Sequence, residues 1–105
     1  MVNKNEIKED LIIRFTPALP VLRASIGISQ GELAEYIGVS RQTYCSLEQS
    51  KRPMSWNNFM ALFMFFYVNP DSKRLMESKQ TFIHEVYNFL QYNKDISKLQ
   101  KDSQS

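Results

Sequence analysis

Two short helical patterns, separated by a single glycine, occupy residues 29–49. Ser29 and Glu32 have the spacing of a capping box, in which each side chain satisfies a backbone amide of the other residue. Gly38 ends this first pattern, because glycine adopts the left-handed conformation of a helix end without strain. Ser40 has the position of the next amino-terminal cap. The sequence therefore predicts two helices of about two turns each, joined by a very tight turn.

The remaining chain also has helical spacing, and strand-like alternation is absent over any useful length. Further helices are predicted over residues 5–15, from Thr16-Pro17 or Leu19-Pro20 to about residue 26, and over 56–68, capped by Ser55. A short segment at 71–77 precedes a last amphipathic helix over 81–92. We expect an all-α bundle of about five helices with an added carboxy-terminal helix, followed by a disordered tail.

Length and composition restrict the class of protein. A chain of 105 residues with 43% hydrophobic content can form one compact domain but not two ordinary ones. A single cysteine excludes an internal disulfide, and the amino terminus lacks the apolar core of a signal peptide, so we expect a cytoplasmic protein. The longest apolar run has ten residues, residues 59–68, which is about half of a membrane span. We expect no membrane association.

The helix predicted over residues 41–49 has two different faces, because each residue advances by about 100° around the axis. Tyr44, Leu47 and Glu48 form the face that docks on the protein. The opposite, polar face contains Arg41, Gln42, Cys45, Ser46 and Gln49. A net charge of +2 is too small to indicate nucleic-acid binding, but residues 40–53 contain three basic residues and one acidic residue.

From about residue 19 to residue 68 the chain resembles the Cro/repressor-type helix-turn-helix family, also called the Xre family. The resemblance rests on Leu22-Arg23, Gly27-Ile28-Ser29-Gln30, Glu32-Leu33-Ala34, Ile37-Gly38-Val39-Ser40-Arg41-Gln42-Thr43, Leu47-Glu48 and Lys51-Arg52. It implies a lambda-repressor-like bundle in which the third helix of the motif enters the major groove of double-stranded DNA. The second helix would then lie across the DNA backbone.

The resemblance and side-chain chemistry together suggest which residues contact DNA. Arginine can bind guanine through two hydrogen bonds and glutamine can bind adenine similarly, so Arg41 and Gln42 are the candidate base contacts, with Ser46 as a third. Gln30 resembles the family's phosphate-contacting glutamine at the start of the second helix. Lys51 and Arg52 are the remaining phosphate candidates, on the opposite strand.

Other residues of the motif have expected structural roles. Family members often pair an arginine and a glutamate at the positions of Arg23 and Glu48, so we expect a partly buried ion pair that fixes the recognition helix. Tyr44 stands where an aliphatic residue is usual, and we expect its ring to pack inward with its hydroxyl near the surface. Ser50 stands where a helix-ending glycine is common. Gly31 lies within a helix, at a cost of about 1 kcal/mol relative to alanine.

Catalytic, redox and metal functions lack the residues they need. Cys45 lies on the exposed side of its predicted helix but has no resolving cysteine, and His84 is the only histidine. A glycine-rich phosphate loop and paired carboxylates are absent from the sequence. We therefore predict a protein without enzymatic activity, cofactor or metal ion.

The predicted helix FMALFMFFYV, residues 59–68, is apolar on all sides. Such clusters are usually core rather than an effector pocket, but a domain of this size buries one helix face unless something covers the other. The helix at 81–92 would cover it within the chain or form the interface of a homodimer. We divide the chain into an amino-terminal segment (1–15), a helix-turn-helix domain (16–69), a helical extension and candidate dimer interface (70–93) and a tail (94–105).

The predicted function is a sequence-specific transcriptional regulator, a repressor, that binds DNA as a homodimer. The alternative is an antitoxin-like interaction module, with the same fold and a hydrophobic surface that binds an unknown protein partner.

Overall fold

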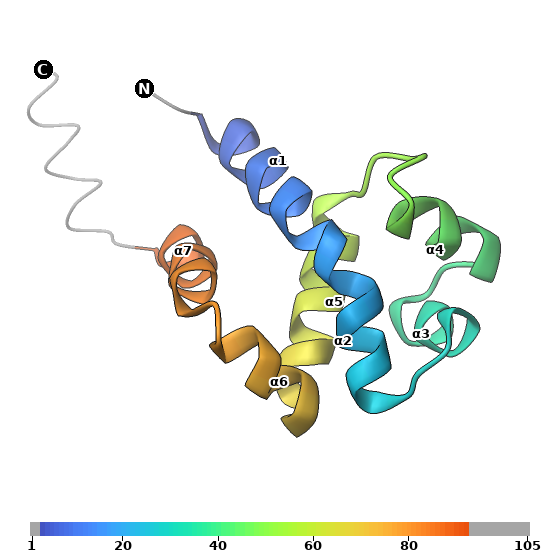
Figure 1. The fold of residues 1–105 in the computed structure, drawn as a ribbon. Coiled ribbons are helices and arrows are strands. Elements are labelled where there is room, and N and C mark those ends of the chain that lie inside the picture. Colours follow the sequence, from blue (N-terminus) through green and yellow to red (C-terminus); the bar gives the residue numbers. More distant parts are fainter. Residues whose placement is uncertain (1–2, 93–105) are drawn as a thin grey trace, which may run out of the picture.

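The computed structural model describes residues 3–92 and contains only helical elements within them (Figure 1). In chain order these are α1 (Lys4–Phe15), the 3-10 helix η1 (Thr16–Ala18), α2 (Leu19–Ile26), α3 (Gln30–Ile37), α4 (Arg41–Glu48), α5 (Trp56–Val68), α6 (Pro70–Glu77) and α7 (Gln80–Leu90). The all-α fold class predicted from the sequence is confirmed. The tail expected to be disordered lies outside the described residues.

The first three elements follow one another without an extended linker. Pro17 lies at the start of η1 and Pro20 in the first turn of α2, where a missing amide hydrogen costs nothing. The Thr16 hydroxyl donates to the carbonyl of Ile12, 2.8 Å away, and so binds η1 to the last turn of α1. Both of the alternative helix starts predicted from the sequence therefore occur: Thr16-Pro17 begins η1 and Leu19-Pro20 begins α2.

Serine side chains cap the three helices that follow α2. Ser29 Oγ accepts from the amide of Glu32 at 3.1 Å, and Glu32 Oε1 accepts in return from the amide of Ser29 at 3.2 Å. The bond from the Ser29 amide, together with the neighbouring Ser29 hydroxyl, lowers the pKa of the Glu32 carboxyl. Ser40 caps α4 and Ser55 caps α5 in the same way, through the amides of Thr43 and Asn58. The capping chemistry explains why the sequence could predict these helix starts.

The centre of the bundle is α5, which lies behind α2 in Figure 1. Phe59, Leu62 and Phe66 are completely buried, and Phe63 is nearly so. Phe15 of α1 meets Phe59 edge-on, with ring centroids 5.3 Å apart. The opposite face of α5 is open, because Met64 and Val68 remain 52% and 64% exposed. The all-round apolar sequence therefore fills the core on one side and leaves a hydrophobic surface on the other.

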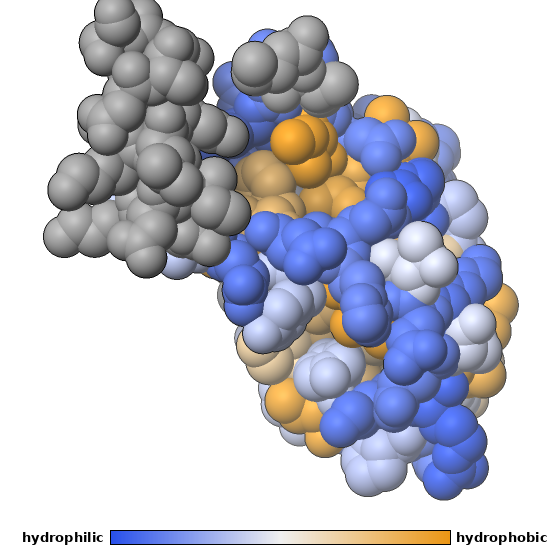
Figure 2. Space-filling view, turned by 90° about the vertical axis from the view of Figure 1, so that its left-hand side faces the viewer, coloured by the Kyte–Doolittle hydropathy of each residue, from blue (hydrophilic) through white to orange (hydrophobic). Residues whose placement is uncertain are grey.

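The carboxy-terminal helices pack against their own chain. Ser72 of α6 is buried and donates to the carbonyl of Phe66, 2.7 Å away. On α7, Val86 is buried and the ring of Phe82 stacks on Phe15 at 5.9 Å. Seen from the side of α7, the surface is largely hydrophilic, with hydrophobic groups between (Figure 2). Much of the apolar stripe of α7 is thus used inside the chain.

Within residues 3–92, no single helix has the length and apolar character needed to cross a bilayer. The segment Lys4–Ile26 passes that test only when taken together with Gln30–Ile37, and a bend of 108° separates the two.

Candidate nucleic-acid interface

The helices α3 and α4 form a closely packed pair at the end of the molecule opposite α7 (Figure 1). Leu33 and Ala34 of α3 and Tyr44 and Leu47 of α4 are buried between this pair and the rest of the bundle. Gly38 has a φ of +79°, and the amide of Val39 donates to the carbonyl of Ala34 at 3.0 Å. This helix-ending motif makes the turn compact, so that the two helices have a defined relative orientation.

Arg41 and Gln42 are both exposed in the first turn of α4. The stem of Arg41 passes close to Gly31 of α3, where an added Cβ would lie 3.6 Å from Arg41 Cδ. That separation is an ordinary van der Waals contact, so glycine is not required at position 31 on steric grounds. The two side chains predicted to contact bases are therefore free of the protein core.

A polar cleft of about 470 Å³ lies between the amino ends of α3 and α4. Its lining consists of Arg23, Ser29, Gln30, Gly31 and Arg41. The guanidinium group of Arg41 and the first turn of a helix, whose amides lack intrahelical partners, together favour an anion, whereas the charge of Arg23 is compensated by Glu48. The structure thus brings Gln30, predicted to contact phosphate, next to Arg41, predicted to contact a base.

Gln30 and Cys45 join the two helices of the motif. Cys45 Sγ donates to Gln30 Oε1 at 3.1 Å, and both side chains are half-buried. The expectation that Cys45 lies on the exposed side of its helix is wrong, because α3 covers that part of α4. The side-chain amide of Gln30 also helps to lower the pKa of the Glu48 carboxyl, so one of its two N–H donors is directed at that carboxylate and the other is left for a ligand.

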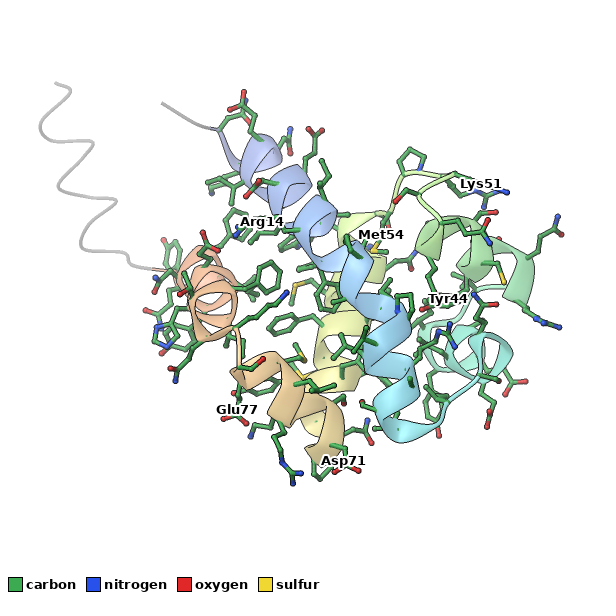
Figure 3. All side chains as sticks on the ribbon, viewed as in Figure 1. Arg14, Tyr44, Lys51, Met54, Asp71 and Glu77 are labelled. Carbon is green, nitrogen blue, oxygen red and sulfur yellow. The ribbon has the colours of Figure 1, made fainter. Side chains whose placement is uncertain are left out.

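Arg52 and Lys51 differ in their contacts. Arg52 Nη1 lies 3.3 Å from Thr43 Oγ1, and the same hydroxyl accepts from Ser40 Oγ at 2.9 Å. Lys51 points outward from the loop after α4 (Figure 3), and the loop returns to the core at Met54. Thr43 was not singled out by sequence reasoning, although its position three residues after the cap Ser40 was a usable signal. The remaining base candidate, Ser46, is half-buried.

Arg23 and Glu48 form a bidentate ion pair between α2 and α4. Nε and Nη2 of Arg23 lie 2.9 and 2.8 Å from the two carboxylate oxygens. Burial alone would raise the pKa of the Glu48 carboxyl, but the hydrogen bonds and charge of Arg23 outweigh it, so that this pKa is lowered. Arg23 Nη1 also reaches the carbonyl of Ile28 at 3.4 Å. The pair fixes α4 relative to α2 and to the turn before α3.

Tyr44 points inward from α4 (Figure 3) and is completely buried. Among the described residues its hydroxyl oxygen has no partner at hydrogen-bonding distance and angle, although it lies near enough to Glu48 to help lower the pKa of that carboxyl. Burial raises the pKa of this hydroxyl far above its ordinary value of 10.0. The ring packs inward as expected, but the expectation that the hydroxyl lies near the surface is wrong, since the hydroxyl is buried close to Arg23 and Glu48.

Ser50 adopts the left-handed conformation that usually favours glycine, with a φ of +59°. The amide of Lys51 donates to the carbonyl of Ser46 at 2.9 Å, and that of Ser50 donates to Leu47 at 3.1 Å. These are the two bonds of a Schellman motif. The end of α4 therefore has the geometry found at Gly38, reached with a residue that pays a steric penalty for it.

Among residues 3–92, no group of three or more His, Cys, Asp and Glu side chains is arranged to hold a metal ion. His84 is exposed on α7.

Comparison with known families agrees with this geometry. Residues 22–55, from α2 to the cap of α5, match the family model described as Helix-turn-helix, so this segment is a DNA-binding helix-turn-helix of the regulator class. The resemblance of these residues to the Cro/repressor-type, or Xre, family is thereby confirmed. Neither a curated protein nor a solved structure matches the chain.

Proposed function

We propose that this protein is a transcriptional repressor that binds a palindromic operator as a homodimer and has no catalytic activity. The observation that carries the proposal is the exposure of Arg41 and Gln42 in the first turn of a helix held by two neighbours. In a helix-turn-helix protein that end of the helix enters the major groove. Arg41 would bind guanine and Gln42 adenine, with Ser46 as a third contact.

Phosphate contacts would come from the edges of the same surface. The amide of Gln30 and the free amides of the first turn of α3 suit one phosphate. Lys51 and Arg52 suit the other strand, because both are exposed in the loop that follows α4. Arg41 also lines the cleft at α3, so a phosphate is the alternative ligand for its guanidinium group.

A single recognition helix contacts too few base pairs for useful selectivity, so two copies would occupy half-sites about 34 Å apart. Two exposed apolar surfaces could join them. One combines Tyr36 of α3 with Met64 and Val68 of α5, and the other lies on α7 at Tyr87 and Leu90. The ring of Tyr36 lies 4.9 Å from Phe65, so the first surface is continuous between α3 and α5.

We favour the surface on α3 and α5 for the second copy. Its residues belong partly to α3, which also carries Gln30, so a contact there would orient the DNA-binding helices directly. The α7 surface lies at the end of the molecule opposite α4 (Figure 1), and much of the stripe beside it is used inside the chain. Met64→Lys and Leu90→Lys each place one charge on one surface. Light scattering should give a monomer for Met64→Lys and a dimer for Leu90→Lys.

Selection of binding sites from random duplex DNA tests the function itself. The intact protein should enrich a palindrome, and the double variant Arg41→Ala, Gln42→Ala should enrich none. A control variant, Glu35→Gln, changes an exposed residue of α3 and should enrich the same palindrome. Failure of the wild-type protein to enrich any sequence would refute the proposal.

The second candidate function is the antitoxin-like module, favoured by the exposure of Tyr36, Met64 and Val68. In that case the α3–α5 surface binds a different protein instead of a second copy. A monomer that aggregates alone, enriches no DNA sequence and is rescued by co-expression of that protein would support this second function.

A further inference from the structure

A cavity of about 540 Å³ lies between the amino-terminal helices and the carboxy-terminal pair α6 and α7. Its apolar walls are formed by Phe15, Val21, Leu22, Leu75, Met76 and Phe82. This volume falls within the range of roughly 300–1,000 Å³ that is usual for sites of small organic ligands. Val21 and Leu75 are 60% and 40% exposed, whereas Leu22 and Met76 are nearly buried. The cavity thus has an open mouth and an apolar floor.

The charged groups of the cavity are cationic, and its one other polar side chain, Ser78, donates to the carbonyl of Leu75. Arg14 and Lys79 both line it, one from α1 and the other from the turn between α6 and α7. Arg14 is committed to Glu85 at 2.7 Å and Asp10 at 2.9 Å, so its charge is compensated. Within residues 3–92, Lys79 forms no ion pair. The cavity therefore combines an apolar floor with one uncompensated positive charge at its edge.

We propose that this cavity is a binding site for an amphipathic carboxylate, with an alkyl chain of medium length in the cavity and the carboxylate at Lys79. The chain would contact Phe15, Leu22 and Phe82, where burial of apolar surface supplies affinity. The ammonium group of Lys79 would select an anionic head over a neutral or cationic one. An apolar floor and a single free cation fit this class of ligand better than a sugar or a polyanion.

The wall of the cavity is also part of the DNA-binding unit. Leu22 lines the cavity, and the next residue of α2, Arg23, holds Glu48 of α4. A ligand in the cavity therefore contacts the helix that fixes the recognition helix. Any effect of the ligand on DNA binding rests on the function proposed above, whereas binding of the ligand itself does not.

The test uses the full chain and sodium decanoate, with decyltrimethylammonium as a cationic probe of the same chain length. Amide resonances are followed by NMR during each titration. Decanoate should give saturable shifts at residues 14–22 and 75–82 with a Kd below about 1 mM, and decyltrimethylammonium should bind at least about fivefold more weakly.

Two variants test separately the contribution of the alkyl chain and the contribution of the carboxylate charge to binding. Val21→Trp fills the mouth without touching the buried core and should weaken decanoate at least about tenfold. Lys79→Glu should weaken decanoate about fivefold and strengthen decyltrimethylammonium. Lys4→Glu, the matched control, makes the same change in net charge on α1 outside the cavity and should leave both affinities unchanged.

Three results would overturn the proposal. The first is decanoate shifts that do not saturate or that spread over the whole surface. The second is an equal loss of affinity in Lys79→Glu and Lys4→Glu. The third is a combination of two observations: the wild-type protein does not bind decanoate, and light scattering shows that Val21→Trp converts a dimer into a monomer. That combination would assign the cavity to a second copy of the chain. Because the readouts are decanoate binding and oligomeric state, none of these results measures DNA binding.

Discussion

Arg23 and Glu48 are joined by two parallel hydrogen bonds of 2.9 and 2.8 Å, although they lie 25 residues apart in the chain. Their side chains are only 19% and 7% exposed. A bidentate pair restricts orientation as well as distance, because the planar guanidinium group fits the carboxylate in one arrangement. The direction in which α4 presents Arg41 and Gln42 therefore depends on α2.

Replacement of one partner should leave the other charge buried without compensation. For Glu48→Gln we expect a loss of about 3 kcal/mol in the free energy of unfolding, at the lower end of values for buried pairs. Urea denaturation followed by circular dichroism measures this loss. The exposed carboxylate variant Glu35→Gln should change stability by less than about 0.5 kcal/mol. Equal effects of the two substitutions would contradict the structural role of the pair.

The same pair predicts how stability depends on pH. The pKa of Glu48 in the folded protein lies below its ordinary value of 4.5, so folding favours the ionised form. The resulting stabilisation is complete above pH 4.5 and is lost as the pH falls through the lower folded pKa. Urea midpoints measured from neutral pH downward should decline more steeply in the wild type than in Glu48→Gln. Parallel curves would exclude Glu48 as the titrating group.

Tyr44→Phe removes a buried hydroxyl that has no partner among the described residues. Since the folded state then no longer desolvates an unpaired polar group, we expect a gain of about 1 kcal/mol in the free energy of unfolding. Thermal and urea unfolding both measure it. A loss of stability instead would mean that the hydroxyl contributes to the neighbouring ion pair.

Ser50→Gly should also stabilise the protein, by about 0.5–1 kcal/mol. Glycine adopts the φ of +59° without the steric cost that a side chain incurs, although its freer unfolded chain offsets part of the gain. The matched control is Gln49→Gly, one residue earlier, where φ is −86° and glycine should destabilise the protein. Calorimetric melting of both variants provides the comparison.

Arg41→Ala and Lys51→Ala distinguish base contacts from phosphate contacts. Arg41→Ala should relax sequence preference at one operator position at a cost of about 1–3 kcal/mol. Lys51→Ala should weaken binding to all sequences and reduce the salt dependence of affinity by about one unit. Fluorescence anisotropy with operator and random duplexes measures both effects. Equal losses on the two duplexes for Arg41→Ala would assign that side chain to the phosphate cleft beside Gln30.

Much of the fold could be predicted because residues close in the sequence determine where its helices begin and end. Ser29, Ser40 and Ser55 accept the amide bonds expected of amino-terminal caps, and Gly27 and Gly38 have the positive φ expected of helix ends. The hydrophobic periodicity could not show whether α7 packs on its own chain. That depends on long-range contacts such as Phe15 with Phe82, which periodicity does not record.

The candidate site was less predictable, because its details depend on how α3 and α4 meet. Helical spacing put Cys45 on the polar face of α4, but α3 covers it and Gln30 accepts its hydrogen bond. The helical spacing likewise predicted that Tyr44 faces the core, but it could not show that the hydroxyl is buried beside the Arg23–Glu48 pair. The contact between Arg52 and Thr43 requires the shape of a loop that has Ser50 in an unusual conformation.

The contact between Cys45 and Gln30 gives the protein an internal reporter. Cys45 is the only thiol in the chain and is half-buried against Gln30 of α3, so that separation of α3 from α4 exposes its sulfur further to an alkylating reagent. The rate of alkylation by a maleimide should therefore rise with the fraction of time that the two helices are apart in the native state. DNA bound across both helices would slow that reaction. The wild-type protein, without any substitution, can therefore report the opening of the motif and its suppression by the operator, from alkylation rates measured with and without DNA.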